Sequence, residues 1–169
     1  DALRQLLFRP SCTINGIWGG YTGPGTKTVI PKEATAKLDV RLVKNMRPER
    51  VFARLQEHLA ARGFGDLELR LVHGYPPSRI APDHPIVQCM VTTLRELGYE
   101  PLLWPTVPGS APFYVWEEIL GRPYITGGLG HGARQHSTDE YFTVEGLLRF
   151  EQSCVLFLEN WAAAPEVGG

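Results

Sequence analysis

The sequence predicts an α/β fold, because segments with the periodicity of a strand alternate with segments that have the periodicity of a helix. Apolar and polar side chains alternate along residues 34–42, as in a strand with one buried face. Residues 48–62 and 86–97 repeat apolar side chains every three or four positions, and a glycine follows each run. Such alternation of strands and helices favours an α/β architecture with some parallel pairing.

The remaining elements before residue 75 follow from local signals. Residues 1–8 consist of helix-forming residues and end before Pro10, which disfavours helical angles in the residue before it. A short strand is expected at 12–17 and a second half-buried strand at 67–71, where leucines alternate with charged residues. Five glycines between positions 16 and 25 predict a tightly turning loop.

A segment with four prolines, residues 75–85, predicts a linker and therefore a domain boundary near residue 80. Beyond it we expect one domain over 81–162, ending in a helix that Thr143 caps, and a disordered tail over 163–169. The other elements expected in the second domain are short: strands at 102–105 and 123–126 and a helix at 112–120.

Composition excludes several classes of function. With a net charge of −1 over 169 residues, the chain has no basic field that would hold a nucleic acid. The longest apolar runs are far shorter than the roughly 20 residues of a membrane-spanning helix, so no membrane partner is expected. Cys12, Cys89 and Cys154 fit neither a disulfide framework nor a thiolate zinc site, and we expect reduced, buried thiols in a cytoplasmic protein.

Two loops carry residues with possible chemistry. His136 precedes Asp139 and Glu140 in a loop, where a carboxylate can orient an imidazole that binds zinc, but a lone loop histidine is also commonly solvated. Ser110 lies in a Pro-Gly-Ser-Ala-Pro turn and is interpreted either as a helix cap or as a nucleophile, although the Gly-x-Ser-x-Gly motif of serine hydrolases is absent. The glycine run 127–132 is not followed promptly by a helix, so we reject a dinucleotide site there.

Two residues of the predicted strands have open interpretations. Arg41 lies on the polar face of its strand, where it either pairs with Asp39 or grips a substrate carboxylate, which its planar guanidinium group fits well. His73 follows the leucine strand and is either a hydrogen-bonded structural histidine or a functional group.

Taken in order, several short motifs resemble the M20 metallopeptidases, in particular carnosinase-like dipeptidases, carboxypeptidase G2 and acetylornithine deacetylase relatives. The resemblance extends over essentially the whole chain. The motifs that carry it are residues 13–17 with 25–31, 36–43, 45–49, 73–74, 109–112 and 136–140. Two motifs depart from the usual pattern: Pro108 and Ala111 stand in the Ser110 loop, and Thr138 and Asp139 stand where the family more often has proline and asparagine.

The resemblance implies a role for each candidate residue. His136 would be a zinc ligand, and His73 would be catalytic, polarising the scissile carbonyl. Arg41, Thr28 and Ser110 would bind the substrate. It also implies a fold: residues 1–80 as the second half of a ferredoxin-like lid or dimerisation domain, followed by the C-terminal α/β part of a zinc-peptidase catalytic domain.

The implied function is hydrolysis of an amide bond in a dipeptide or N-acyl amino acid by a homodimeric enzyme with two zinc ions. The family's His-x-Asp pair is absent from this chain. The only Glu-Glu pair of this chain, Glu117-Glu118, follows the expected lid domain. We therefore expect a fragment that retains no zinc and is inactive alone. The alternatives are a stand-alone dimerisation or ligand-binding module and a serine hydrolase that uses Ser110.

Overall fold

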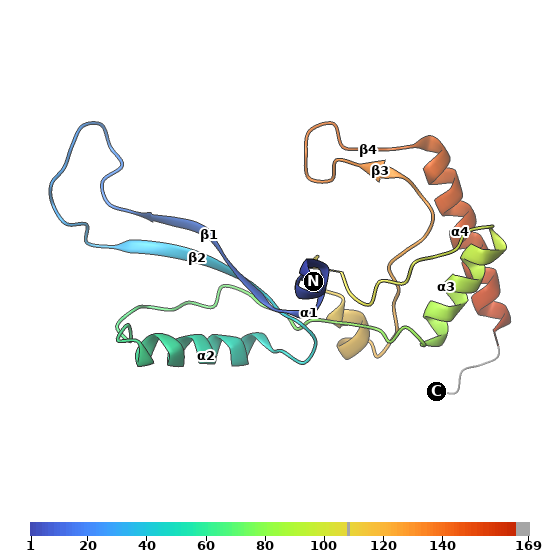
Figure 1. Ribbon diagram of the computed structural model, residues 1–169, viewed down its shortest axis with the longest axis horizontal. Helices are drawn as coiled ribbons and strands as arrows, with labels where there is room; N and C mark the ends of the chain where they lie inside the picture. The colour runs from blue at the N-terminus through green and yellow to red at the C-terminus, as the bar shows by residue number, and fades with distance from the viewer. Residues whose placement is uncertain (108, 165–169) are drawn as a thin grey trace. The chain divides into compact units, whose positions relative to one another are not determined.

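The computed structural model describes residues 1–107 and 109–164, and its chain falls into two compact units (Figure 1). Unit 1 comprises residues 1–77 and 107–112, and unit 2 comprises 78–106 and 113–169. The last five residues of the predicted tail, 165–169, lie outside the described part. In chain order the elements are α1 (Ala2–Phe8), β1 (Ser11–Gly19), β2 (Ala34–Arg41), α2 (Pro48–Ala61), α3 (Pro85–Glu96), the π-helix η1 (Val115–Ile119), β3 (Gly132–Ala133), β4 (Tyr141–Phe142) and α4 (Val144–Ala163).

The hairpin of β1 and β2 is the framework of unit 1. The strands pair antiparallel, and a bulge between Ile14 and Gly16 inserts one extra residue into β1. Because the bulge shifts the alternation by one residue, Ile14 and Ile17 both lie opposite apolar residues of β2. The hairpin thus has one apolar face, as the alternation in the sequence predicts.

The prediction that this apolar face is buried was wrong. Ile14, Ile17 and Leu38 are 62%, 75% and 46% exposed. In the described residues the sheet has only two strands, and two strands bury little surface without a covering layer.

Helix α2 begins at Pro48, which suits the first turn of a helix, and its apolar stripe is half-buried as predicted. The strand predicted at 67–71 does not form. Leu67 and Leu69 instead line a small hollow with Leu59 and Phe64, so these leucines pack against α2 rather than pairing in a sheet.

Unit 2 is built on the packing of α3 against α4. The fully buried Thr93 donates a hydrogen bond to the carbonyl oxygen of Cys89 (2.9 Å) and accepts one from Asn160 (3.1 Å), which also donates to Glu96 (2.9 Å). Val91 and Leu94 form the apolar part of this contact. Burial raises the pKa of the Cys89 thiol, a hydrogen bond with Thr93 opposes the shift, and the charge of Glu96 adds to it.

Glycines of the run 127–132 allow the chain to lie against α4. A Cβ at Gly128 would be 3.0 Å from the Phe150 ring, and its φ of 135° is one that glycine favours. The hydroxyl of Ser153 donates to the Phe150 carbonyl (2.7 Å) and accepts from the Leu129 amide (3.4 Å). This close packing accounts for the glycine at position 128.

Thr143 caps α4, as predicted, by accepting a hydrogen bond from the Gly146 amide (3.0 Å). Its backbone amide also donates to the His131 carbonyl (2.9 Å), which joins the helix to the loop before it. We expect Thr143→Ala to lower the free energy of unfolding by about 1 kcal/mol in a urea titration, because the first turn of α4 loses its cap. Thr143→Ser should retain most of that stability, and Thr126→Ala, at an exposed loop position, is the control.

Three further predictions differ from the structure. Residues 102–105 and 123–126 form no strand, and the helix predicted at 112–120 is the shorter η1. Both strand pairs in the described residues are antiparallel, so the predicted parallel pairing is absent there. Cys12 is exposed, whereas Cys89 and Cys154 are half-buried, and all three are free thiols.

The chain exposes an unusually large surface. Its accessible area is 13638 Å², whereas two separate folded domains of half its mass would expose about 10,000 Å² in total. Large apolar side chains contribute to it, and Leu102, Phe142, Val144 and Leu158 are each more than 60% exposed. Among the helices of the described residues, none is long and apolar enough to span a bilayer.

Candidate functional site

Arg41 and Ser110, two of the predicted substrate-binding residues, meet in unit 1. Arg41 is the last residue of β2, and its Nη1 donates a hydrogen bond to Oγ of Ser110 at 2.8 Å. The pair is 69 residues apart in sequence. A guanidinium group and a hydroxyl side by side are the donors that a carboxylate needs.

Asp39 lies two positions before Arg41 on the same face of β2. Its Oδ2 is 3.7 Å from Nε of Arg41, and both side chains are 48% exposed. Such a pair adds at most about 1 kcal/mol to stability but restrains where the guanidinium group lies. Both interpretations of Arg41 thus remain compatible with its surroundings.

The other two predicted residues of unit 1 are exposed and lie outside regular structure. Thr28 is in the long loop between β1 and β2, where Tyr21 stabilises a turn by donating a hydrogen bond to the Pro24 carbonyl (3.1 Å). His73 precedes Gly74, at which a Cβ would lie 2.8 Å from Pro48 at the start of α2. The glycine therefore allows the chain carrying His73 to pass close to that helix.

His136 lies at the tip of a hairpin in unit 2. Strands β3 and β4 pair antiparallel and flank the loop 134–140, which is exposed throughout. The base of the hairpin is packed closely, because a Cβ at Gly132 would lie 2.7 Å from the Tyr141 carbonyl oxygen. A short, anchored hairpin of this kind presents an imidazole to the surroundings of the unit.

The backbone of this loop is left-handed at three positions. Arg134, His136 and Asp139 have φ values of 64°, 62° and 60°, and of these residue types arginine is the one that adopts this conformation least readily. Strain of this kind clusters at functional sites, because elsewhere a less costly residue serves as well.

Sequence reasoning missed Arg134 and Ser137 as partners in the loop. The amide and the hydroxyl of Ser137 both donate to the Arg134 carbonyl, at 3.1 and 2.8 Å. The carboxylate of Asp139, predicted as one of two groups that could orient His136, lies 3.7 Å from Nη1 of Arg134. No pattern of residue types in the sequence marks a turn with histidine in a left-handed position.

Glu117, one of two adjacent glutamates, has a structural role. Its Oε2 accepts hydrogen bonds from the Ser78 hydroxyl (2.5 Å) and the Arg79 amide (3.2 Å). These bonds attach η1 to the proline-rich segment within unit 2. Phe113 and Tyr124 stack at 4.8 Å beside it.

The residues described do not themselves fit a metal centre. Across residues 1–107 and 109–164, no three His, Cys, Asp or Glu side chains gather where they could hold a metal ion. A zinc site needs at least three protein ligands, and the sequence predicts only one here, His136. The predicted zinc centre therefore cannot be assembled from these side chains.

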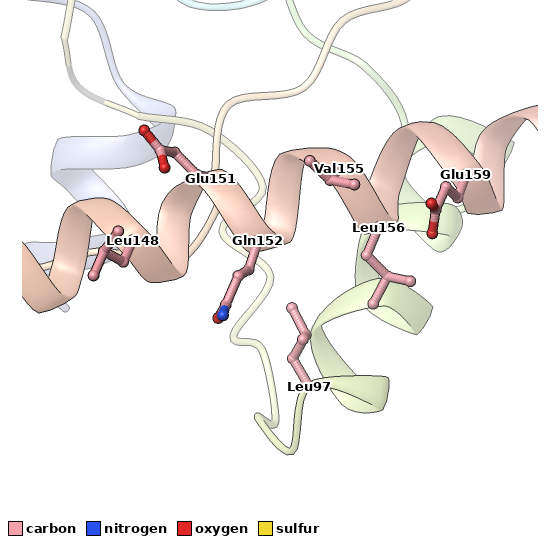
Figure 2. A pocket seen from close by; sticks show the side chains of 7 residues that line it. All are labelled: Leu97, Leu148, Glu151, Gln152, Val155, Leu156 and Glu159. Atoms are coloured by element: carbon pink, nitrogen blue, oxygen red, sulfur yellow. The ribbon is translucent and has the colours of Figure 1, made fainter.

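Unit 2 has a groove along α4. Figure 2 shows Leu97 from the end of α3 and Leu156 from α4 pointing toward one another on its floor. Glu151 and Glu159 lie at its rim, and it contains no histidine, cysteine or hydroxyl group. Its lining suits packing against another apolar surface better than it suits catalysis.

Residues 1–66 match the family described as the M20 peptidase dimerisation domain. Residues 1–66 are thus similar to an M20 peptidase dimerisation domain. The resemblance predicted from its motifs is therefore confirmed.

Relatives that this chain matches are dipeptidases. The Beta-Ala-His dipeptidase of Rattus norvegicus is 37% identical over 82 residues, which are 46% of this chain and 17% of the relative. The Cys-Gly metallodipeptidase of Schizosaccharomyces pombe is 40% identical over 62 residues, 35% of this chain and 13% of the relative. The chain thus spans less than a fifth of these curated relatives.

The similarity of structure extends further along the chain. An M20 family metallo-carboxypeptidase from Sulfolobus solfataricus matches with a TM-score of 0.79 and 28% identity, over 96% of this chain and 38% of that one. The mixed α/β fold therefore corresponds to part of an M20 peptidase structure. The predicted roles of Thr28, Arg41, His73, Ser110 and His136 stay predictions.

Proposed function

We propose that this chain is part of an M20-type metallopeptidase or amidohydrolase, in which it binds the carboxylate end of a small peptide or N-acyl amino acid. The observation that supports this most directly is the 2.8 Å hydrogen bond between Arg41 and Ser110. Two residues to which the resemblance gives a substrate-binding role adjoin one another, although 69 positions separate them. Dipeptides and N-acyl amino acids share the free carboxylate that such a pair recognises.

The roles of the histidines complete the proposal. His73 would stabilise the negative charge that develops on the scissile carbonyl oxygen, and Thr28 would contact substrate from the long hairpin loop. His136 would supply one ligand of a two-zinc centre whose other ligands come from outside the residues described. The chain by itself would then hold no zinc and would not hydrolyse amides.

The fold and assembly fit the same proposal. Unit 1 would be the second half of a ferredoxin-like lid domain, and unit 2 would be the C-terminal α/β segment of a catalytic domain. In the described residues the hairpin of β1 and β2 has two unpaired edges and an exposed apolar face. A homodimer joined through this domain would cover part of that surface. A cytoplasmic location, supported by three cysteines without a disulfide, belongs to the same proposal.

The proposal is tested by expressing the full-length protein that contains this chain. We expect it to hydrolyse dipeptides or N-acyl amino acids, to lose activity when a chelator removes its metal, and to regain activity with zinc. The isolated chain should have no activity under the same conditions. A full-length protein that binds about two zinc ions yet cleaves no substrate with a free carboxylate would contradict the proposed substrate class.

The two alternatives make different predictions in the same assays. A serine hydrolase would resist the chelator and react with a fluorophosphonate at Ser110. The contact described above gives that alternative no support, because a guanidinium group cannot accept the serine proton. A stand-alone dimerisation or binding module would show neither hydrolysis nor zinc binding in any length of the chain.

A further inference from the structure

The face of the β1–β2 hairpin that carries Arg41 is polar. Residues paired directly across antiparallel strands share a face, so Ser11 lies beside Arg41 and Thr13 beside Asp39. Both of these hydroxyl residues are small, uncharged and exposed. Asp39 is the only acidic residue of the two strands, and its Oδ2 is 3.7 Å from Nε of Arg41.

The next charged residue on this face is Lys37, two positions or about 7 Å further along β2. Its ammonium group lies 5.5 Å from the centre of the Trp18 ring, a distance typical of a cation–π contact. Lys37 therefore has an aromatic partner on the hairpin, and the charge of this face that lies beside the guanidinium group is the carboxylate of Asp39.

We infer that Asp39 makes the carboxylate site selective for substrates whose C-terminal residue has a cationic side chain. This inference rests on the proposed function, in which Arg41 and Ser110 bind the free carboxylate of the substrate. The carboxylate and the side chain of that residue leave the same α-carbon, so a carboxylate held at Arg41 brings the side chain near Asp39. A lysine ammonium group is attracted there, whereas a glutamate carboxylate is repelled.

The exposure of the site sets the size of the effect. The side chains of Asp39 and Arg41 are both 48% exposed, and an exposed ion pair changes an equilibrium by about fivefold at most. Attraction and repulsion add when a lysine substrate is compared with a glutamate substrate. Asp39 should therefore contribute about tenfold to the preference for lysine.

The test measures kcat/KM of the full-length protein for alanyl-lysine, alanyl-glutamine and alanyl-glutamate. Asp39→Asn should lower the ratio of the lysine substrate to the glutamate substrate about tenfold, and Asp39→Glu, which keeps the charge, should retain most of it. If Asp39 only orients Arg41, Asp39→Asn should instead change all three substrates by the same factor, and the inference is wrong. Asp66→Asn removes an exposed carboxylate from the loop after α2 and, as the control, should leave the ratio within about twofold.

A second measurement does not depend on catalysis. Lysine and glutamate are the amino acids that two of these substrates would release, and both carry the free carboxylate. In calorimetric titrations of the full-length protein, Asp39→Asn should bring their two Kd values about tenfold closer together. Raising the ionic strength from about 0.01 M to about 1 M should have a similar effect on the unmodified protein, because the Debye length falls from about 30 Å to about 3 Å.

The outcomes separate the inference from the proposed function. If Arg41→Lys raises KM for all three dipeptides but Asp39→Asn leaves the ratio unchanged, the carboxylate site stands and the selectivity is wrong. If Arg41→Lys changes KM for none of them, the carboxylate site fails and the inference fails with it.

Discussion

Replacing His136 by alanine in the full-length protein is expected to lower kcat/KM for dipeptide hydrolysis by about a thousandfold and to reduce the bound zinc below two ions per subunit. A ligand withdrawn from a metal centre costs several kcal/mol of transition-state stabilisation, and about 4 kcal/mol corresponds to that factor. Zinc content by atomic absorption and steady-state kinetics measure the two effects. Full activity in this variant would remove His136 from the site.

Position 136 should also distinguish glycine from alanine in the stability of the chain. Because the φ of His136 is 62°, His136→Gly should unfold with a free energy about 1 kcal/mol higher than His136→Ala. Gln135, its neighbour, is not among the residues with positive φ, so there alanine should be the more stable substitution. Urea titrations of the four variants, all in the 169-residue chain, compare a strained position with an ordinary one. If glycine and alanine rank alike at both positions, the turn is not strained.

The helices could be predicted from the sequence because their signals are local. Apolar spacing predicts α2 and α3. Thr143 is predicted as the cap of α4, and its hydroxyl accepts a hydrogen bond from the amide of Gly146, three residues further along the chain. These patterns act within one or two turns of chain, and no distant partner is needed.

Strands depend on neighbours that a pattern does not supply. The alternation at 34–42 forms β2 because β1 pairs with it, whereas the leucines at 67–71 have the same alternation and form no strand; Leu67 and Leu69 line a hollow beside α2. The prediction that this face is buried was wrong for the same reason: Leu38 lies on the predicted apolar face, but no layer of the described residues covers it closely. The period of a segment specifies which side chains share a face, and the tertiary contacts decide whether that face is buried.

The sequence predicts which residues belong to the candidate site, but not how they are arranged in space. Arg41 and Ser110 were each selected for chemistry that their side chains can perform, yet no spacing rule brings them within 2.8 Å. Likewise, His136 was selected as an imidazole in a loop, and its left-handed backbone depends on hydrogen bonds from Ser137 that residue types alone do not specify.

Arg41→Lys in the full-length protein should raise KM for a dipeptide about a hundredfold while kcat changes less. Lysine keeps the positive charge but lacks the planar pair of donors that fits a carboxylate, and a hydrogen bond to a charged group contributes about 1.5–3 kcal/mol. A dipeptide amide offers the matched control, since it has no terminal carboxylate and should be cleaved almost equally by both proteins. Stability should change little, because the pair with Asp39 is about half exposed.

Ser110 decides whether Arg41 acts alone or as one of a pair. If its hydroxyl only orients the guanidinium group, Ser110→Ala should raise KM about fivefold to tenfold, and should have almost no effect once Arg41 is lysine. Such non-additivity in a double-mutant cycle is expected only for groups that share one interaction. Effects that simply multiply would mean that each residue contacts the substrate independently. A loss of kcat without a change in KM would place Ser110 in the chemical step, which the proposed carboxylate site does not allow.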